Sequence, residues 1–225
     1  LWGIENIMIA GDPELPATWD RVDDALQRDY EHTSGARLRV AACLIDRGYK
    51  GKGTDDFTRP RNSRRIYSCY GSTTPGQPIA SGITRQGSRR TPSVRVGTDT
   101  AKSHIFSRLK LLRAGPRFMH FPEGPFAFDL EYFEQLVSEH EEITWQPGGK
   151  VSRKWVKTRA RNEALDKMVY LFAALEVLRP NFESIARGLV TSTPAKEYVL
   201  KPDAPKQAPP PPPIVLAELL EPAPP

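Results

Sequence analysis

Proline is concentrated at the C-terminal end of this 225-residue chain, and that placement limits how much of the chain can fold. Ten of the 22 prolines lie in residues 202–225, and five of them form the uninterrupted run 209–213. Proline has no backbone N–H and favours an extended conformation, so this segment cannot bury enough surface to fold alone. We therefore predict one folded domain over residues 1–190 and a disordered, proline-rich tail over residues 191–225.

The tail allows two interpretations, because residues 214–220 form a short, mainly apolar patch after the proline run. The segment is either a frayed terminus or a docking peptide on a semi-rigid spacer. A docking peptide would bind an assembly partner. The sequence leaves both possibilities open.

The composition, with 39% hydrophobic and 26% charged residues, is that of a globular chain. No apolar run approaches the roughly 18–20 residues of a membrane span, so we expect no membrane association. Residues 1–10 lack the basic segment and cleavage site of a signal peptide. Cys43 and Cys69 are too few for a disulfide framework or a structural zinc site, which favours a reducing, cytoplasmic location. The absence of an initiator Met suggests a fragment or an incomplete gene model.

Hydrophobic spacing and turn residues predict strands that alternate with helices, which indicates an α/β fold built on a sheet. The strongest helix signal is the largely apolar segment 162–178, which Pro180 ends. We expect strands over residues 2–10, 38–45, 65–69, 93–96 and 118–121, a hairpin formed by 143–146 and 155–157, and further helices over 17–30, 54–65, 98–112 and 130–140.

Two aspartates are candidates for a shared catalytic site. Asp46 follows the apolar run that ends at Ile45, and sites in α/β sheets form at the carboxyl ends of strands. Asp166 lies in the first turn of the predicted helix 162–178, on the face that also carries Asn162 and Glu163. Two close carboxylates repel each other, and a bound Mg²⁺ or Mn²⁺ removes that repulsion. The pair therefore predicts a metal site.

Each aspartate also has a purely structural interpretation. Asp46 could cap the turn that follows it. Asp166 could form an ion pair with Arg159 or Arg161. Spacing alone does not decide between these interpretations and a metal site.

Positive charge is clustered in the chain, whose net charge is +5. Residues 47–117 hold sixteen Lys and Arg against three acids, and residues 150–161 hold six and no acid. Such runs are a solvated face or a surface that attracts the phosphates of duplex DNA without reading its sequence. The side chains that we expect to contact DNA are Lys102, Arg64, Arg65, Arg159 and Arg161.

The glycine-rich segment 48–54 is a weak candidate for a phosphate-binding loop. It fails the GxxxxGK[ST] pattern because Thr54 stands where lysine is required. We therefore expect no ATPase motor in this chain.

Several segments resemble, in order, those of the nuclease domain of lambda-type tailed-phage terminase large subunits. The resemblance covers roughly residues 2–189, and the ordered series is more specific than any single segment. The segments are residues 42–49 (Ala-Cys-Leu-Ile-Asp-Arg-Gly-Tyr), 70–72, 96–102 (Val-Gly-Thr-Asp-Thr-Ala-Lys), 115–116, 120–122, 131–136 and 161–166 (Arg-Asn-Glu-Ala-Leu-Asp).

The resemblance implies an RNase H-like mixed sheet flanked by helices and a metal-dependent endonuclease with a two-metal site in the full-length protein. Such an enzyme cuts concatemeric viral DNA during packaging into proheads, in the host cytoplasm, with the terminase small subunit and the portal or prohead as partners. The family's catalytic acids, which bind Mg²⁺ or Mn²⁺, match Asp46 and Asp166. Glu163 matches a family position but is not assigned as a ligand.

The chain departs from the family at its N-terminal end. The motor domain would precede this chain, and so would the first strand of the nuclease fold, which carries another catalytic Asp. Trp2 matches the strand that follows it. An alternative is therefore an inactive prophage remnant that binds DNA or a prohead component. A third interpretation is an unrelated α/β enzyme with a small phosphorylated substrate.

Overall fold

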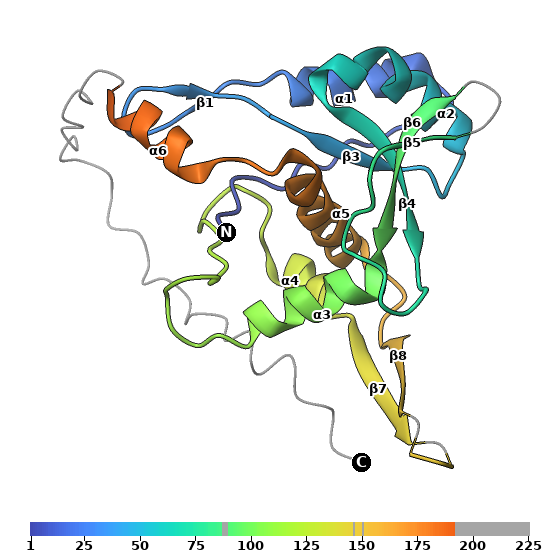
Figure 1. Ribbon diagram of the computed structural model, residues 1–225. Helices are drawn as coiled ribbons and strands as arrows, with labels where there is room; N and C mark the ends of the chain where they lie inside the picture. Colours follow the sequence, from blue (N-terminus) through green and yellow to red (C-terminus); the bar gives the residue numbers. More distant parts are fainter. Residues whose placement is uncertain (87–89, 146, 150, 192–225) are drawn as a thin grey trace.

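The computed structural model describes residues 1–86, 90–145, 147–149 and 151–191. All but the first residue of the predicted tail therefore lies outside the described residues. Within them, the chain forms a mixed sheet flanked by helices, as predicted (Figure 1).

The central sheet has the strand order β3-β4-β6-β5. Strands β3 (Cys43–Asp46), β4 (Ile66–Ser72) and β6 (Thr91–Gly97) are parallel, and the edge strand β5 (Thr84–Gln86) runs antiparallel to β6. Because the three parallel strands end at the same edge, Asp46 lies where the fold places functional groups.

The two faces of the sheet are covered by different helices. Tyr67 and Cys69 on β4 join the main hydrophobic core, whereas the alternating positions Ile66 and Ser68 face the opposite side. Figure 1 shows α1 (Pro16–Leu26) and α2 (Gly51–Thr58) on one side of the sheet and α5 (Glu163–Leu178) on the other. The 3₁₀ helix η1 (Arg59–Arg64) continues α2, because Pro60 disturbs the regular α-helix there.

Helix α5 is the centre of the core. Leu165, Val169, Phe172 and Ala173 are at most 2% exposed. The helix contacts β3, α3 (Thr98–Leu109) and α4 (Leu130–Leu136). It ends at Arg179, whose left-handed conformation (φ 43°) stops the helix before Pro180.

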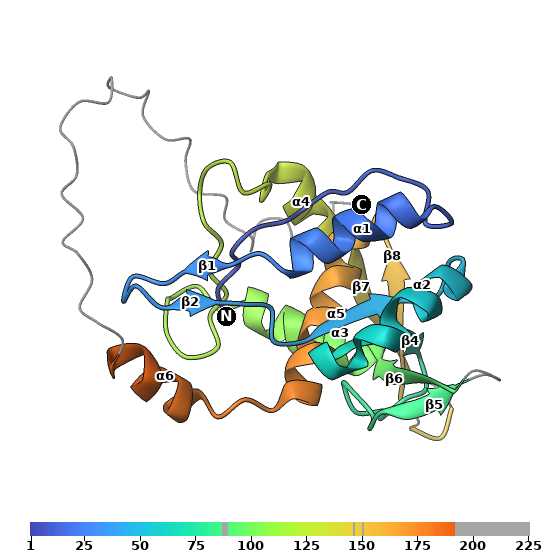
Figure 2. The same ribbon diagram turned by 90° about the horizontal axis from the view of Figure 1, so that it is seen from above.

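Two hairpins and a terminal helix surround this core. Strands β1 (Tyr30–Glu31) and β2 (Arg37–Leu38) form one hairpin. Strands β7 (Glu139–Trp145) and β8 (Val151–Lys157) form a longer hairpin that projects from the body of the molecule (Figure 1). Figures 1 and 2 both show α6 (Phe182–Thr191) on the side of the molecule remote from α2 and β5.

Several sequence predictions need correction. The strands predicted over residues 2–10 and 118–121 are reduced to one parallel bridge between Trp2 and His120. The segment 38–45 forms the end of β2 and most of β3 rather than one strand. The predicted helix over 130–140 ends at Leu136, which leaves Glu139 on β7, and β5 and α6 were not predicted.

Removal of a core side chain on α4 tests this packing. Leu136 is fully buried, so Leu136→Ala should lower the free energy of unfolding by about 2–5 kcal/mol, measured by urea denaturation. Leu112→Ala is the control, because Leu112 is 76% exposed and its loss should change stability by less than about 0.5 kcal/mol. Equal effects of the two substitutions would contradict the assigned core.

Candidate active site

Asp46 is held in place by the backbone around it. It is the last residue of β3, and its Oδ1 accepts the Gly48 N–H at 3.0 Å. The hydroxyl of Thr54 on α2 donates to the Asp46 carbonyl oxygen at 3.2 Å. Asp46 thus caps the following turn while its carboxylate stays exposed. The structural role and a catalytic role are compatible.

Asp46 and Asp166 line the same pocket. This cavity of about 510 Å³ lies between β3 and α5 and is bounded by residues 42–46 and by Glu163, Asp166 and Tyr170. The pocket forms because α5 packs against β3, which brings together two aspartates 120 positions apart in the sequence. The structure therefore places the two predicted acids at one site.

Burial raises the pKa of Asp166 above its ordinary value. The negative charges of Glu139 and Asp46 act in the same direction, and the nearby Lys102 and Lys157 oppose them. Such a carboxylate, partly buried and close to other acids, is favoured in its ionised form by an added cation.

Tyr170 is the aromatic neighbour of both acids. It lies one turn after Asp166 on α5 and lines the same pocket. Burial, followed by the charge of Asp46 and a hydrogen bond to it, raises the pKa of the Tyr170 hydroxyl. The phenol stays protonated and can donate to the Asp46 carboxylate.

A buried polar network lies beside Asp166. Lys102 Nζ on α3 contacts Glu139 Oε2 on β7 at 2.6 Å, and Asn162 Nδ2 donates to Glu139 Oε1 at 2.9 Å. Lys157 Nζ on β8 donates to Asn162 Oδ1 at 3.0 Å. The side chains of Glu139 and Lys102 are 3% and 12% exposed.

Sequence reasoning missed Glu139 because the segment 130–140 was predicted to be one helix. The run of acids that begins at Glu139 also reads as a solvated surface. Asn162 was noted on the same face as Asp166, and its side chain is indeed buried. Glu163, in contrast, is exposed and forms an ion pair with Arg161 at 3.4 Å.

Four of the five basic residues predicted to contact DNA are engaged with acids. Lys102 binds Glu139, as described above. Arg64 binds Asp23 at 2.6 Å. Arg159 binds Glu134 at 3.0 Å, and Arg161 binds Glu131 at 2.6 Å. The fifth residue, Arg65, is exposed. Among the described residues, Arg159 and Arg161 bind Glu134 and Glu131, so the alternative in which either arginine pairs with Asp166 is not the arrangement found.

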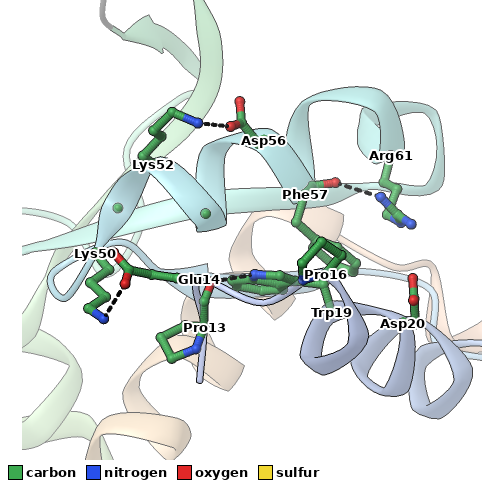
Figure 3. Close-up of a pocket in the computed structure, with 12 residues that line it drawn as sticks. Pro13, Glu14, Pro16, Trp19, Asp20, Lys50, Lys52, Asp56, Phe57 and Arg61 are labelled. Atoms are coloured by element: carbon green, nitrogen blue, oxygen red, sulfur yellow. Dashed lines mark hydrogen bonds and ion pairs between the residues drawn. The ribbon is translucent and has the colours of Figure 1, made fainter. Parts of the chain in front are cut away.

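A larger cavity of about 760 Å³ lies between α1 and α2 and includes part of the glycine-rich segment (Figure 3). Trp19 stacks on Phe57 at its floor, and the Trp19 Nε1 donates to the Pro13 carbonyl oxygen at 2.7 Å. Its lysines are bound by acids, with Lys50 at 2.8 Å from Glu14 and Lys52 at 2.7 Å from Asp56. Volume alone therefore does not distinguish this cavity from the pocket that holds the two candidate aspartates.

Other candidate chemistry is limited within the described residues. They contain no group of three or more His, Cys, Asp or Glu side chains placed to hold a metal ion. Cys43 and Cys69 are free thiols, and burial raises the pKa of Cys43 to about 11 and that of Cys69 further. Among the helices described, none has the length and apolarity needed to span a bilayer.

Comparison with known proteins gives a consistent result. The chain is 32% identical over 185 residues to the terminase large subunit of Escherichia phage lambda, a match that covers 78% of this chain. It is 30% identical over 180 residues to the terminase large subunit of Enterobacteria phage P21, with 77% covered. The chain spans 28% of the length of each relative. No solved structure gives a significant match.

The family model described as "Terminase large subunit gpA, endonuclease domain" matches residues 1–186, which include both aspartates of the pocket between β3 and α5. Together with the two phage relatives, a match over this much of the sequence establishes that the chain belongs to the endonuclease-domain family of terminase large subunits.

Proposed function

We propose that this chain is a metal-dependent endonuclease domain that cuts concatemeric viral DNA during packaging into proheads. The observation that carries the proposal is the pocket that Asp46 and Asp166 share. Membership of the endonuclease-domain family supplies the class of reaction. The proposed setting is the host cytoplasm, with the small subunit and the portal or prohead as partners.

The donor set in the pocket fits Mg²⁺ or Mn²⁺ in part. Two carboxylates offer the oxygen ligands that these ions prefer. Burial and the negative charge of Asp46 both disfavour the ionised form of Asp166, and a bound cation would offset this effect. A bound pair of such ions supplies an activated water and stabilises the leaving oxygen. In this proposal, Asp46 and Asp166 hold the metal, and Tyr170 orients Asp46 by donating a hydrogen bond to it.

An additional strand would complete the site. Within the described residues, β3 pairs only with β4, and the pocket lies along its other edge. We propose an RNase H-like sheet in which a further strand, carrying a third aspartate, pairs with β3 at this edge.

Duplex DNA is the proposed substrate. The five basic residues named above lie between the two aspartates in sequence; four of them are paired with acids, and Arg65 is exposed. The tail outside the described residues is a candidate contact to an assembly partner.

An inactive DNA- or prohead-binding remnant is the second candidate. It is favoured by one observation: although Asp46, Glu163 and Asp166 all line the pocket, the described residues contain no three His, Cys, Asp or Glu side chains placed to hold one metal ion. Cutting therefore has to be tested with and without an N-terminal extension that adds a strand.

The first test measures nicking of supercoiled plasmid with Mn²⁺. A form extended at its N-terminus should nick the plasmid, and chelation by EDTA should stop it. Asp46→Asn and Asp166→Asn should each lower the rate by at least about 100-fold, because each removes a metal ligand. Binding of the same DNA, measured by fluorescence anisotropy, should change less than about threefold.

Asp20→Asn is the matched control for this test, because Asp20 is an exposed aspartate on α1 that lines the other cavity. Its nicking rate should equal that of the parent. An extended form that binds DNA yet never cuts it would support the inactive remnant instead.

A second test uses stability. The pKa of Asp166 is raised, so its ionisation opposes folding, and stability is lost as pH rises from the unfolded-state pKa through the folded-state pKa. Asp166→Asn should therefore raise the melting temperature at pH 7, and the gain should vanish below about pH 4. If calorimetry showed the variant to be less stable than the parent at pH 7, ionised Asp166 would not oppose folding as expected.

A further inference from the structure

The ion pair between Lys102 and Glu139 is unusual because both side chains are removed from solvent. Its N–O distance is 2.6 Å, and the two side chains are 12% and 3% exposed. The free-energy cost of moving two charged groups out of water can exceed the gain from their attraction. Apolar residues of similar size would therefore stabilise the fold at least as well. A role in function is a reason to keep such a pair.

The pair lies at the point where three elements meet. Lys102 comes from α3, Glu139 from the first residue of β7, and Asn162 from the N-cap of α5. Glu139 has both oxygens occupied, one by Lys102 at 2.6 Å and the other by the Asn162 amide at 2.9 Å. This two-point attachment fixes the carboxylate and therefore the ammonium group that it binds.

The network is joined to Asp166, whose backbone N–H donates to the Asn162 carbonyl oxygen at 3.0 Å, and the Lys102 charge acts on two further acids. This charge lowers the pKa of Asp166 and of Asp99, although burial raises both overall. Lys102 has three N–H donors, and its hydrogen bond to Glu139 uses one. The ammonium group therefore belongs to the same buried network as the N-cap of α5, the helix that carries Asp166.

We propose that Glu139, braced by Asn162, is a positioning residue that holds the Lys102 ammonium beside Asp166, where it contacts the phosphate being cut. This inference rests on the proposed nuclease function. Glu139 itself touches neither DNA nor metal, and it acts only through Lys102. The buried pair thus presents a fixed positive charge to an oxygen that gains negative charge in the reaction.

The test is a double-substitution cycle in the N-terminally extended form. Glu139→Gln keeps the size and the hydrogen-bonding shape but removes the charge, and it should lower kcat about 10- to 100-fold with KM for DNA changed less than about twofold. In a Lys102→Gln background, adding Glu139→Gln should lower kcat by less than about twofold, because the partner is already lost. Glu139→Asp, which keeps the charge, should retain more activity than Glu139→Gln.

The control disrupts an exposed ion pair of similar length. Lys52 and Asp56 lie 2.7 Å apart, with Lys52 79% exposed. Asp56→Asn should leave kcat unchanged. Melting temperatures identify any variant that fails to fold, and such a variant is replaced by Asn162→Ala, which loosens Glu139 without removing a charge. Equal rate losses from Glu139→Gln in both backgrounds, or no loss in either, would overturn the proposal.

A chemical measurement separates this inference from the nuclease proposal. Acylation of lysine amines, read by mass spectrometry, should modify Lys102 slowly in the parent and at least about fivefold faster in Glu139→Gln. Duplex DNA should protect Lys102 further in the parent, whether or not the DNA is cut. Fast modification in the parent, or no protection by DNA, would reject the positioning role; a parent that protects Lys102 but never nicks would reject only the nuclease.

Discussion

The packing of α5 against the parallel strands is the contact on which the rest of the structure depends. Its buried face joins β3, α3 and α4 into one core. Its first turn holds the buried core residues Ala164 and Leu165 and also carries Asp166, which lines the pocket beside β3. The hydrophobic burial of one face of the helix therefore sets the position of Asp166 at its N-terminal end. Asp46 and Asp166 line the same pocket because each is attached to a rigid element, β3 and α5 respectively.

This core was largely predictable, because its signals are local. The apolar run in α5, the stop at Pro180 and the glycine turn between β7 and β8 all act within a few residues. The pairing of Asp46 with Asp166 was left undecided by these patterns and was favoured by the family resemblance; both residues line the pocket between β3 and α5. What local patterns could not supply was the length of the elements near the edges, where packing partners decide whether a strand forms.

The predictions failed where a residue's partner lies far along the chain. Residues 2–10 have the alternation of a strand, but Trp2 makes only one bridge and remains 73% exposed. Glu139 was assigned to the wrong element, and its partners Lys102 and Asn162 lie 37 and 23 positions away. Buried polar networks join residues that lie far apart in the sequence, so local sequence patterns do not predict them.

Among the strands that the structure describes, β3 pairs on one side alone, and its other edge has a consequence for handling the chain. A strand edge that lacks a neighbour presents unpaired N–H and C=O groups, and these groups pair readily with the same edge of a second molecule. The apolar wall of the adjoining pocket adds to this tendency. At high concentration the chain should therefore self-associate through this edge, and its solubility should depend on whatever covers β3.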